Sequence, residues 1–259
     1  MQGESPERLS KIPGFDPLNA EIVDSSAELP ALSPERLLPE RIRSRFSKTL
    51  AWTPEFSGDP FQNRAGELRV ASVLIAMVRR PDELHVLLTQ RTAHLRSHAG
   101  QIAFPGGRRD VSDESAVATA LREAAEEVGL LADRIEVLGT LPDYLTGTGF
   151  KVTPVVALVS PPFELALQVD EVEEAFEVPL SFLMNPRYHQ RRLVRWEKGE
   201  RSFYAMPFRA GIAPGSPHNR PVNAQVPVSL PIPDREYFIW GATAAMLRNL
   251  YWFLAADDV

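Results

Sequence analysis

The amino-acid sequence predicts a layered α/β domain, and three observations lead to this fold class. Apolar and β-branched runs recur along the chain as candidate strands. One long helix-forming segment interrupts them near the middle, and a second, apolar helix-forming segment lies close to the C-terminus. Strands that alternate with helices build a sheet that the helices cover. With 259 residues, 44% of them hydrophobic and 24% charged, the chain can bury a sizeable core and has the composition of a soluble globular protein.

Residues 1–65 are predicted to be an N-terminal extension with one helix, ahead of a main domain over residues 66–259. The first 30 residues are rich in proline, serine and charge without periodicity, so they are expected to be loosely ordered or to lie on the surface. A helix is predicted from Pro39, because apolar residues recur four apart and form one stripe. These residues are Leu38, Ile42, Phe46 and Leu50. We expect this helix to pack against the main domain.

Two strands are predicted before the central helix. The run over residues 68–78 is apolar and partly β-branched, which is typical of a buried strand. Residues 84–89 return as a second strand after a charged turn. Arg91 and Arg96 then begin the loop that leads to Phe104.

The central helix is predicted from its capping residues and its composition. Ser112 or Asp113 is the expected N-cap, the following residues are strong helix formers, and Gly129 stands where a left-handed glycine ends a helix. The last turns carry three carboxylates at spacings of three and four, which predicts that they share one helical face. These residues are Glu123, Glu126 and Glu127.

This carboxylate cluster predicts a bound divalent cation. Like charges at this spacing each destabilise a helix by roughly 0.2–0.5 kcal/mol, and the helix C-terminus prefers cations. Arg122 can reach Glu126, but one guanidinium does not neutralise three carboxylates. All-oxygen ligands favour Mg²⁺ or Mn²⁺. Gly106 and Gly107, which precede the helix, let the backbone approach a phosphate or a metal closely.

Further strands are predicted after the helix. Residues 135–141 and 152–159 read as strands around a glycine-bearing loop, residues 142–149, that is expected to border the pocket. An acidic cluster at residues 170–174 then leads into an apolar run at residues 176–180.

The C-terminal third is predicted to contain a hairpin, a long loop and a terminal helix. The hairpin spans residues 191–208, and its turn is Lys198-Gly199-Glu200. Prolines punctuate residues 209–235, a loop that either folds over the site or forms a disordered excursion. A last strand at residues 237–240 precedes a helix at residues 242–255 that is apolar nearly all round. Such a helix is expected to be buried in the domain or at a subunit contact, which would make a homodimer.

Composition excludes several classes of function. A net charge of −6 argues against a general nucleic-acid binder, and the absence of cysteine excludes disulfides, zinc–thiolate sites and thiol nucleophiles. His94 and His98 lie four apart, but their segment is not convincingly helical and offers no third ligand, which argues against a histidine metal site. No signal-peptide core or membrane-span run is evident, so a cytoplasmic location without membrane contact is expected.

The glycine pair and the helix together resemble the Nudix box, the signature of hydrolases acting on a nucleoside diphosphate linked to another group. The matching positions are Gly107 and the run Arg122-Glu123-Ala124-Ala125-Glu126-Glu127-Val128-Gly129-Leu130. The step from Gly107 to Arg122 is one residue longer than the family's common spacing, and the early acidic residue of the box corresponds to Asp113 or Glu114. The resemblance implies the Nudix fold, a mixed β-sheet sandwiched between α-helices.

A second motif resembles the one that marks the coenzyme A diphosphatase subgroup, which also tends to carry the longer box spacing. It consists of Leu87-Leu88-Thr89, Arg91, Arg96, Gly100 and Phe104-Pro105-Gly106-Gly107. The resemblance implies metal-dependent hydrolysis of the diphosphate bond of coenzyme A or acyl-coenzyme A. The products would be 3′,5′-ADP and 4′-phosphopantetheine or its acyl form.

The same resemblance implies roles for individual residues. Glu123 and Glu127 are the expected metal ligands, with Glu126 as a further ligand or as the general base. The expected catalytic residues are Arg122, which would orient the glutamates, Glu126 and Glu127. The expected substrate-binding residues are Arg91, Arg96, Gly106 and Gly107, and a further carboxylate near the metal would be Glu171 or Glu174.

Two other functions stay open. The substrate is either coenzyme A or another nucleoside diphosphate derivative such as ADP-ribose or NADH, because the fold and the box do not fix the leaving group. A non-catalytic ligand sensor with the same fold is the second alternative, and the intact box glutamates speak against it.

Overall fold

The computed structural model describes residues 15–48, 51–59, 68–93, 100–197, 199–209 and 235–257. The predictions made for Leu50, His94, Arg96, His98, Lys198 and residues 210–234 lie outside this part. The described helices are α1 (Pro39–Phe46), α2 (Ala116–Val128), α3 (Leu180–Leu183) and α4 (Gly241–Ala255). None of the described helices has the length and apolar character that crossing a membrane would require.

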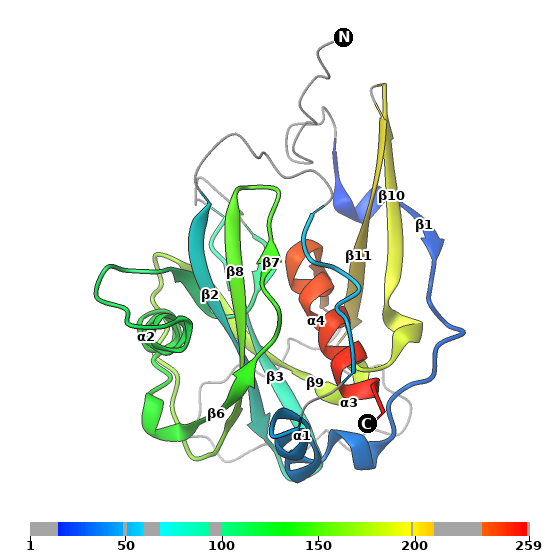
Figure 1. Cartoon of the computed structure of the whole chain (residues 1–259). Helices are drawn as coiled ribbons and strands as arrows, with labels where there is room; N and C mark the ends of the chain where they lie inside the picture. Colours follow the sequence, from blue (N-terminus) through cyan, green and yellow to red (C-terminus); the bar gives the residue numbers. More distant parts are fainter. Residues whose placement is uncertain are drawn as a thin grey trace.

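A mixed sheet of eight described strands forms the centre of the molecule (Figure 1). Its main path runs β4-β3-β2-β8-β6, while β5 pairs with β2, β7 with β8 and β9 with β3. The parallel pairing is that of β2 with β8, and the other pairings are antiparallel. The strands are β2 (Arg69–Arg79), β3 (Leu84–Arg91), β4 (Ile102–Ala103), β5 (Gly106–Arg108), β6 (Ile135–Thr140), β7 (Tyr144–Leu145), β8 (Phe150–Val159) and β9 (Val172–Pro179).

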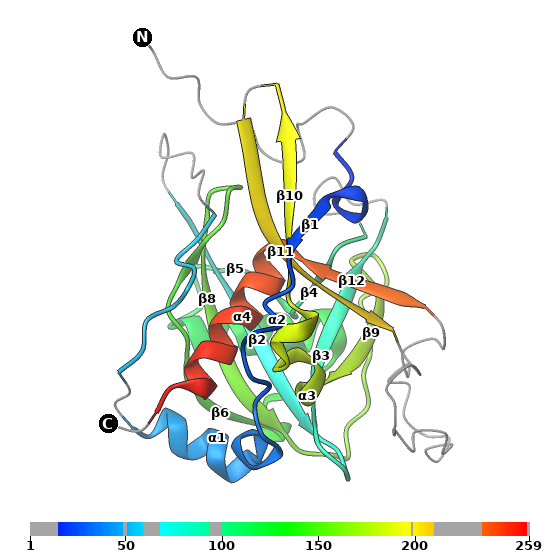
Figure 2. The same ribbon diagram turned by 90° about the vertical axis from the view of Figure 1, so that its right-hand side faces the viewer.

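A second sheet lies beside the first and was not predicted as a sheet. Its order is β1-β10-β11-β12, and the hairpin of β10 and β11 extends beyond the large sheet (Figure 2). The predicted hairpin is therefore confirmed. The strands are β1 (Glu21–Asp24), β10 (Gln190–Trp196), β11 (Gly199–Arg209) and β12 (Glu236–Trp240).

Helices cover both faces of the large sheet, as predicted. Helix α2 lies on one face and α4 on the other, between the two sheets (Figure 1). The apolar stripe of α2 contains Ala120, Ala124 and Val128, which are fully buried against strand residues such as Leu74 and Ala76. Because alanine is small, α2 approaches the sheet closely, and the other side chains on its buried face come into reach of the strands.

Helix α4 is buried within the domain. Most of its residues are buried, and they form one core with the two sheets. The sequence left burial in the domain or at a subunit contact open for this helix, and burial in the domain accounts for its apolar surface.

Both ends of α2 obey capping rules, but its start differs from the prediction. The N-cap is Ser115, whose Oγ accepts a hydrogen bond from the Ala118 N–H, rather than Ser112 or Asp113. The reason is that the side chains of the two expected caps are used elsewhere, because Ser112 bonds to Asp110 and Asp113 bonds to Arg122. At the C-terminus, the predicted left-handed glycine is confirmed, since Gly129 has φ of 71°.

The described N-terminal residues are more regular than the sequence predicts. Residues 21–24, for which no regular element is predicted, form β1 and pair with β10, although their side chains are exposed. Helix α1 is confirmed, and Ile42 is fully buried. It packs as expected, with the Phe46 ring 4.5 Å from that of Phe253 in α4.

Candidate functional site

The site lies where the C-terminal half of α2 faces β5 and Arg91, the last residue of β3. Glu123 and Glu127 point toward these strands, since their side chains are only 16% and 6% exposed. Glu126 is different, with a side chain that is 59% exposed. Each residue turns an α-helix by about 100°, so residues four apart lie about 40° from each other while Glu126 falls about 100° from Glu127. The three carboxylates therefore span an arc of about 100° of the helix, in which Glu123 and Glu127 are buried and Glu126 lies at the exposed edge.

Glu127 is the most buried of the three helix glutamates. Its Oε2 accepts a hydrogen bond of 2.9 Å from the Gly106 N–H, and its Oε1 lies 3.5 Å from Nη1 of Arg91. Burial raises the pKa of Glu127 to about 7, against the opposing effects of the Gly106 amide and of Arg91. A carboxylate whose charge is this poorly compensated is suited to a cation.

Glu123 occupies the space above Gly107. A Cβ atom at Gly107 would lie 2.6 Å from the carboxyl carbon of Glu123, so only glycine leaves room for this carboxylate. Burial raises the pKa of Glu123 as well, although Arg122 donates a hydrogen bond of 2.9 Å to it. The glycine pair thus supports the two buried glutamates directly.

Arg122 joins the acidic residues around the helix into one network. Its guanidinium donates two hydrogen bonds to Asp113, of 3.0 and 2.9 Å, one to Glu123 and one of 2.8 Å to Glu126. Arg122 holds the pKa of Asp113 well below its usual range, so Asp113 is a carboxylate at neutral pH. Of the two residues considered for the early acid of the box, Asp113 is buried in this network and Glu114 is exposed.

Arg91 lies at the end of β3, not in a loop, and faces the carboxylates. Its guanidinium lies 3.5 Å from Glu127 and 3.9 Å from Glu171. The charge of Glu171 raises the pKa of both Glu123 and Glu127, which places it near them. Of Glu171 and Glu174, Glu171 is thus the one that lies beside Arg91, and it stays the candidate for an additional carboxylate of the site.

Glu174 does not join the site. Its carboxylate accepts hydrogen bonds of 2.7 Å from the Tyr237 hydroxyl and 2.8 Å from Arg235. Its backbone pairs with Gln90 of β3, whose side chain also binds Arg235. Side chains alternate along a strand, so Gln90 and Glu174 face away from Arg91.

The charge and chemistry of the site fit a divalent cation. Five carboxylates, those of Asp113, Glu123, Glu126, Glu127 and Glu171, surround two guanidinium groups, those of Arg91 and Arg122. The excess of negative charge and the hard oxygen donors both suit Mg²⁺ or Mn²⁺.

The described side chains supply only part of the coordination shell that a metal ion needs. No three acidic or histidine side chains of the described segments are gathered into a ready-made metal cluster. Mg²⁺ commonly keeps water and substrate oxygens in its shell, so two protein carboxylates are enough for such a site.

Ser72, directly across from Gly107, carries a buried hydroxyl without a partner, which the sequence had not singled out. A lone serine within an apolar strand is the signal that would have revealed it.

Gly107→Ala is expected to lower kcat at least about tenfold in a folded protein, because the added Cβ displaces the carboxylate of Glu123. That carboxylate is the end of a flexible side chain, so we expect Tm to fall by less than about 3 °C. Gly106→Ala is the matched control, since its Cβ would collide with backbone atoms, at 2.6 Å from the Val73 Cα. It should lower Tm by more than about 5 °C. The two variants losing the same Tm would contradict this division of roles.

Comparisons with known proteins agree with the box. The family model described as NUDIX domain matches residues 68–196. The chain is 39% identical over 183 residues to the uncharacterized Nudix hydrolase NudL of Escherichia coli K12, covering 70% of this chain and 81% of that protein. It is 37% identical over 198 residues to NudL of Shigella flexneri, covering 76% and 86%. A crystal structure of a Nudix hydrolase from M. smegmatis, RenU, aligns with a TM-score of 0.39 and 26% identity, over 50% of this chain and 80% of that one.

Proposed function

The chain belongs to the Nudix hydrolase family, and from that premise we propose that its substrate is coenzyme A or an acyl-coenzyme A. A Nudix hydrolase cleaves a diphosphate bond in a nucleoside diphosphate derivative. The proposed products are 3′,5′-ADP and 4′-phosphopantetheine or its acyl form. One observation supports coenzyme A above the other substrates. The segment that resembles the coenzyme A motif contains both Arg91 and Gly106, and both contact the same box carboxylate, Glu127.

The proposal assigns the metal to the two buried glutamates. Glu123 and Glu127 would hold Mg²⁺ or Mn²⁺, with Glu126 as a further ligand or as the general base. When bound, the cation neutralises the diphosphate oxygens and lowers the pKa of the attacking water.

The remaining residues act by position and charge. Arg122 keeps Glu123 and Asp113 in place, as its hydrogen bonds indicate. Arg91 stands next to Glu127 with its guanidinium toward the site, and it would bind a phosphate oxygen of the substrate by charge-assisted hydrogen bonds. Glu171 lies beside Arg91 and is a second candidate for the general base.

A substrate panel tests the proposal. Equal concentrations of coenzyme A, acetyl-coenzyme A, ADP-ribose and NADH are incubated with the protein and Mg²⁺ or Mn²⁺, and the products are separated by chromatography. We expect 3′,5′-ADP from the coenzyme A species at least about tenfold faster than cleavage of the others, a difference of about 1.4 kcal/mol in the barrier. A chelator should abolish the reaction. Cleavage of ADP-ribose or NADH alone would overturn the substrate, and binding without any cleavage would favour a sensor.

A further inference from the structure

Ser72 of β2 is a polar residue in a buried, apolar part of the large sheet. Its side chain is fully buried, and its Oγ has no hydrogen-bond partner among the described residues. The next two residues on its face of the strand, Leu74 and Ala76, are apolar and belong to the core formed with α2. A buried hydroxyl that is left without a partner costs roughly 1–3 kcal/mol. Packing alone therefore does not account for a serine at this position.

Ser72 lies on the face of the sheet that carries the box carboxylates. It pairs with Gly107 of β5, and directly opposite residues of an antiparallel pair point to the same face. At Gly107 this is the face of Glu123, because a Cβ atom there would lie 2.6 Å from the carboxyl carbon of Glu123. The Ser72 side chain therefore points toward α2.

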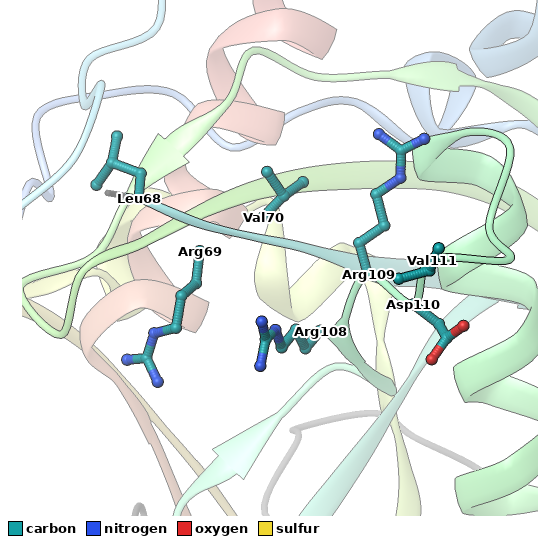
Figure 3. A pocket seen from close by; sticks show the side chains of 7 residues that line it. All are labelled: Leu68, Arg69, Val70, Arg108, Arg109, Asp110 and Val111. Carbon is teal, nitrogen blue, oxygen red and sulfur yellow. The ribbon is translucent and has the colours of Figure 1, made fainter. Parts of the chain in front are cut away.

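The alternation of side chains along the two strands gives the same result. Figure 3 shows a hollow of about 410 Å³ beside β2 and β5, where Arg69 and Arg108 leave the strands on one side and Arg109 leaves on the other. Successive side chains point to opposite faces, so Gly107 faces away from Arg108. Ser72, three residues after Arg69, faces away from Arg69 for the same reason. Ser72 and Gly107 therefore share the face opposite these two arginines.

The missing side chain of Gly107 makes Ser72 and Glu123 neighbours. The Cβ atoms of directly opposite residues lie about 4.5–5.5 Å apart. At Gly107 the Glu123 carboxylate fills the place that a side chain would take, with its Oε2 2.6 Å from the position of a Cβ. The two groups are not bonded in the described arrangement, but rotation about the side-chain bonds of Glu123 can bring them into contact.

Glu123 has an oxygen that can accept this hydrogen bond. Its Oε1 accepts a hydrogen bond of 2.9 Å from Arg122, whereas its Oε2 accepts none from the described residues. A carboxylate has about four lone-pair positions, so Glu123 can accept from both Arg122 and Ser72 and still hold a cation. A buried donor without an acceptor thus lies beside a carboxylate oxygen without a donor.

We propose that Ser72 is a positioning residue of the metal site, whose hydroxyl donates a hydrogen bond to the Glu123 carboxylate when that carboxylate holds the cation. The inference rests on the metal assignment made in the proposed function. Arg122 holds one oxygen of Glu123, and Ser72 would hold the other, which fixes the direction of the carboxylate. Partners of this kind, which contact a ligand rather than the metal, are typically worth about 10–100-fold in metal affinity or activity.

Ser72→Ala tests this role, because it removes the hydroxyl and little else. We expect the Kd for Mg²⁺, measured by calorimetry without substrate, to rise at least about tenfold. The Tm of the metal-free variant should equal or exceed that of the wild type, since the lost hydroxyl has no partner there. A high concentration of Mg²⁺ should return kcat close to the wild-type value, because Ser72 acts only through the affinity for the cation.

Thr243→Val is the matched control. It removes another buried hydroxyl, one that has a partner, since Oγ1 of Thr243 donates a hydrogen bond of 3.1 Å to the Ile102 carbonyl. Thr243 belongs to α4, on the other face of the large sheet. This variant should lower Tm and leave the Kd for Mg²⁺ unchanged.

The outcomes separate the positioning role from the metal assignment itself. An unchanged Kd in Ser72→Ala, together with a Kd that rises at least about tenfold in Glu123→Gln, would overturn the role of Ser72 and keep the metal at Glu123. A loss of Tm in metal-free Ser72→Ala as large as that of Thr243→Val would also overturn it, because the hydroxyl would then be structural. An unchanged Kd in Glu123→Gln would instead overturn the metal assignment of the proposed function.

Discussion

Glu127→Gln is expected to lower kcat at least about a hundredfold at saturating Mg²⁺ and pH 8. Glutamine has nearly the same shape, and its carbonyl oxygen can still accept the hydrogen bond from the Gly106 amide. It has no negative charge, so it neither holds a divalent cation well nor accepts a proton. The measurement is steady-state hydrolysis, with a titration of Mg²⁺ binding by calorimetry. Glu114→Gln, an exposed glutamate just before α2, is the control and should behave like the wild type.

The same substitution should stabilise the metal-free protein at pH 8. Burial raises the pKa of Glu127 from 4.5 to about 7, so the folded state holds a proton more tightly than the unfolded state. The carboxyl group therefore imposes no penalty below pH 4.5, and stability is lost as the pH rises through 7. The full penalty is on the order of 3 kcal/mol, and Glu127→Gln removes it. We expect a higher Tm than that of the wild type at pH 8 and a vanishing difference near pH 4.5.

These two measurements separate function from folding. A folded Glu127→Gln protein with near-normal turnover would show that Glu127 is not required for the reaction. A lower Tm than that of the metal-free wild type at pH 8 would contradict the burial of an uncompensated charge at this position.

The local features of the site could be predicted from the sequence. Helix α2 depends on residues close in sequence, namely a run of helix formers that ends at Gly129, and it forms where expected. Its start was misplaced because several side chains near Ser115 can cap a helix, and tertiary partners decide which of them does so. The division between buried Glu127 and exposed Glu126 follows from helical geometry, but the sequence does not say which part of the stripe faces the sheet.

Contacts between distant segments could not be predicted in the same way. Arg91 and Glu127 are 36 residues apart, and only the pairing of β3 with its neighbours brings the arginine to the carboxylate. The choice between Glu171 and Glu174 depends on the strand register of β9, which a pattern of acidic residues does not fix. The small sheet was missed for a similar reason, since β1 and β12 join the hairpin from opposite ends of the chain.

Arg122→Met is expected to lower kcat/KM at least about tenfold and to lower Tm at pH 7, because buried hydrogen-bond acceptors lose their donor. Methionine fills similar space but removes the hydrogen bonds to Asp113, Glu123 and Glu126, which leaves the buried Asp113 carboxylate without its guanidinium. Since Arg122 holds the pKa of Asp113 below its usual range, the pair stabilises the fold at neutral pH, and this stabilisation is lost as the pH falls through the low pKa of Asp113 in the folded state. The Tm values of variant and wild type should therefore converge in acid. A double-mutant cycle with Asp113→Asn checks the contact, because the two losses of stability should be smaller together than their sum. Strictly additive losses would show that the two residues act independently. Arg122 would then not link Asp113 to Glu123 and Glu126.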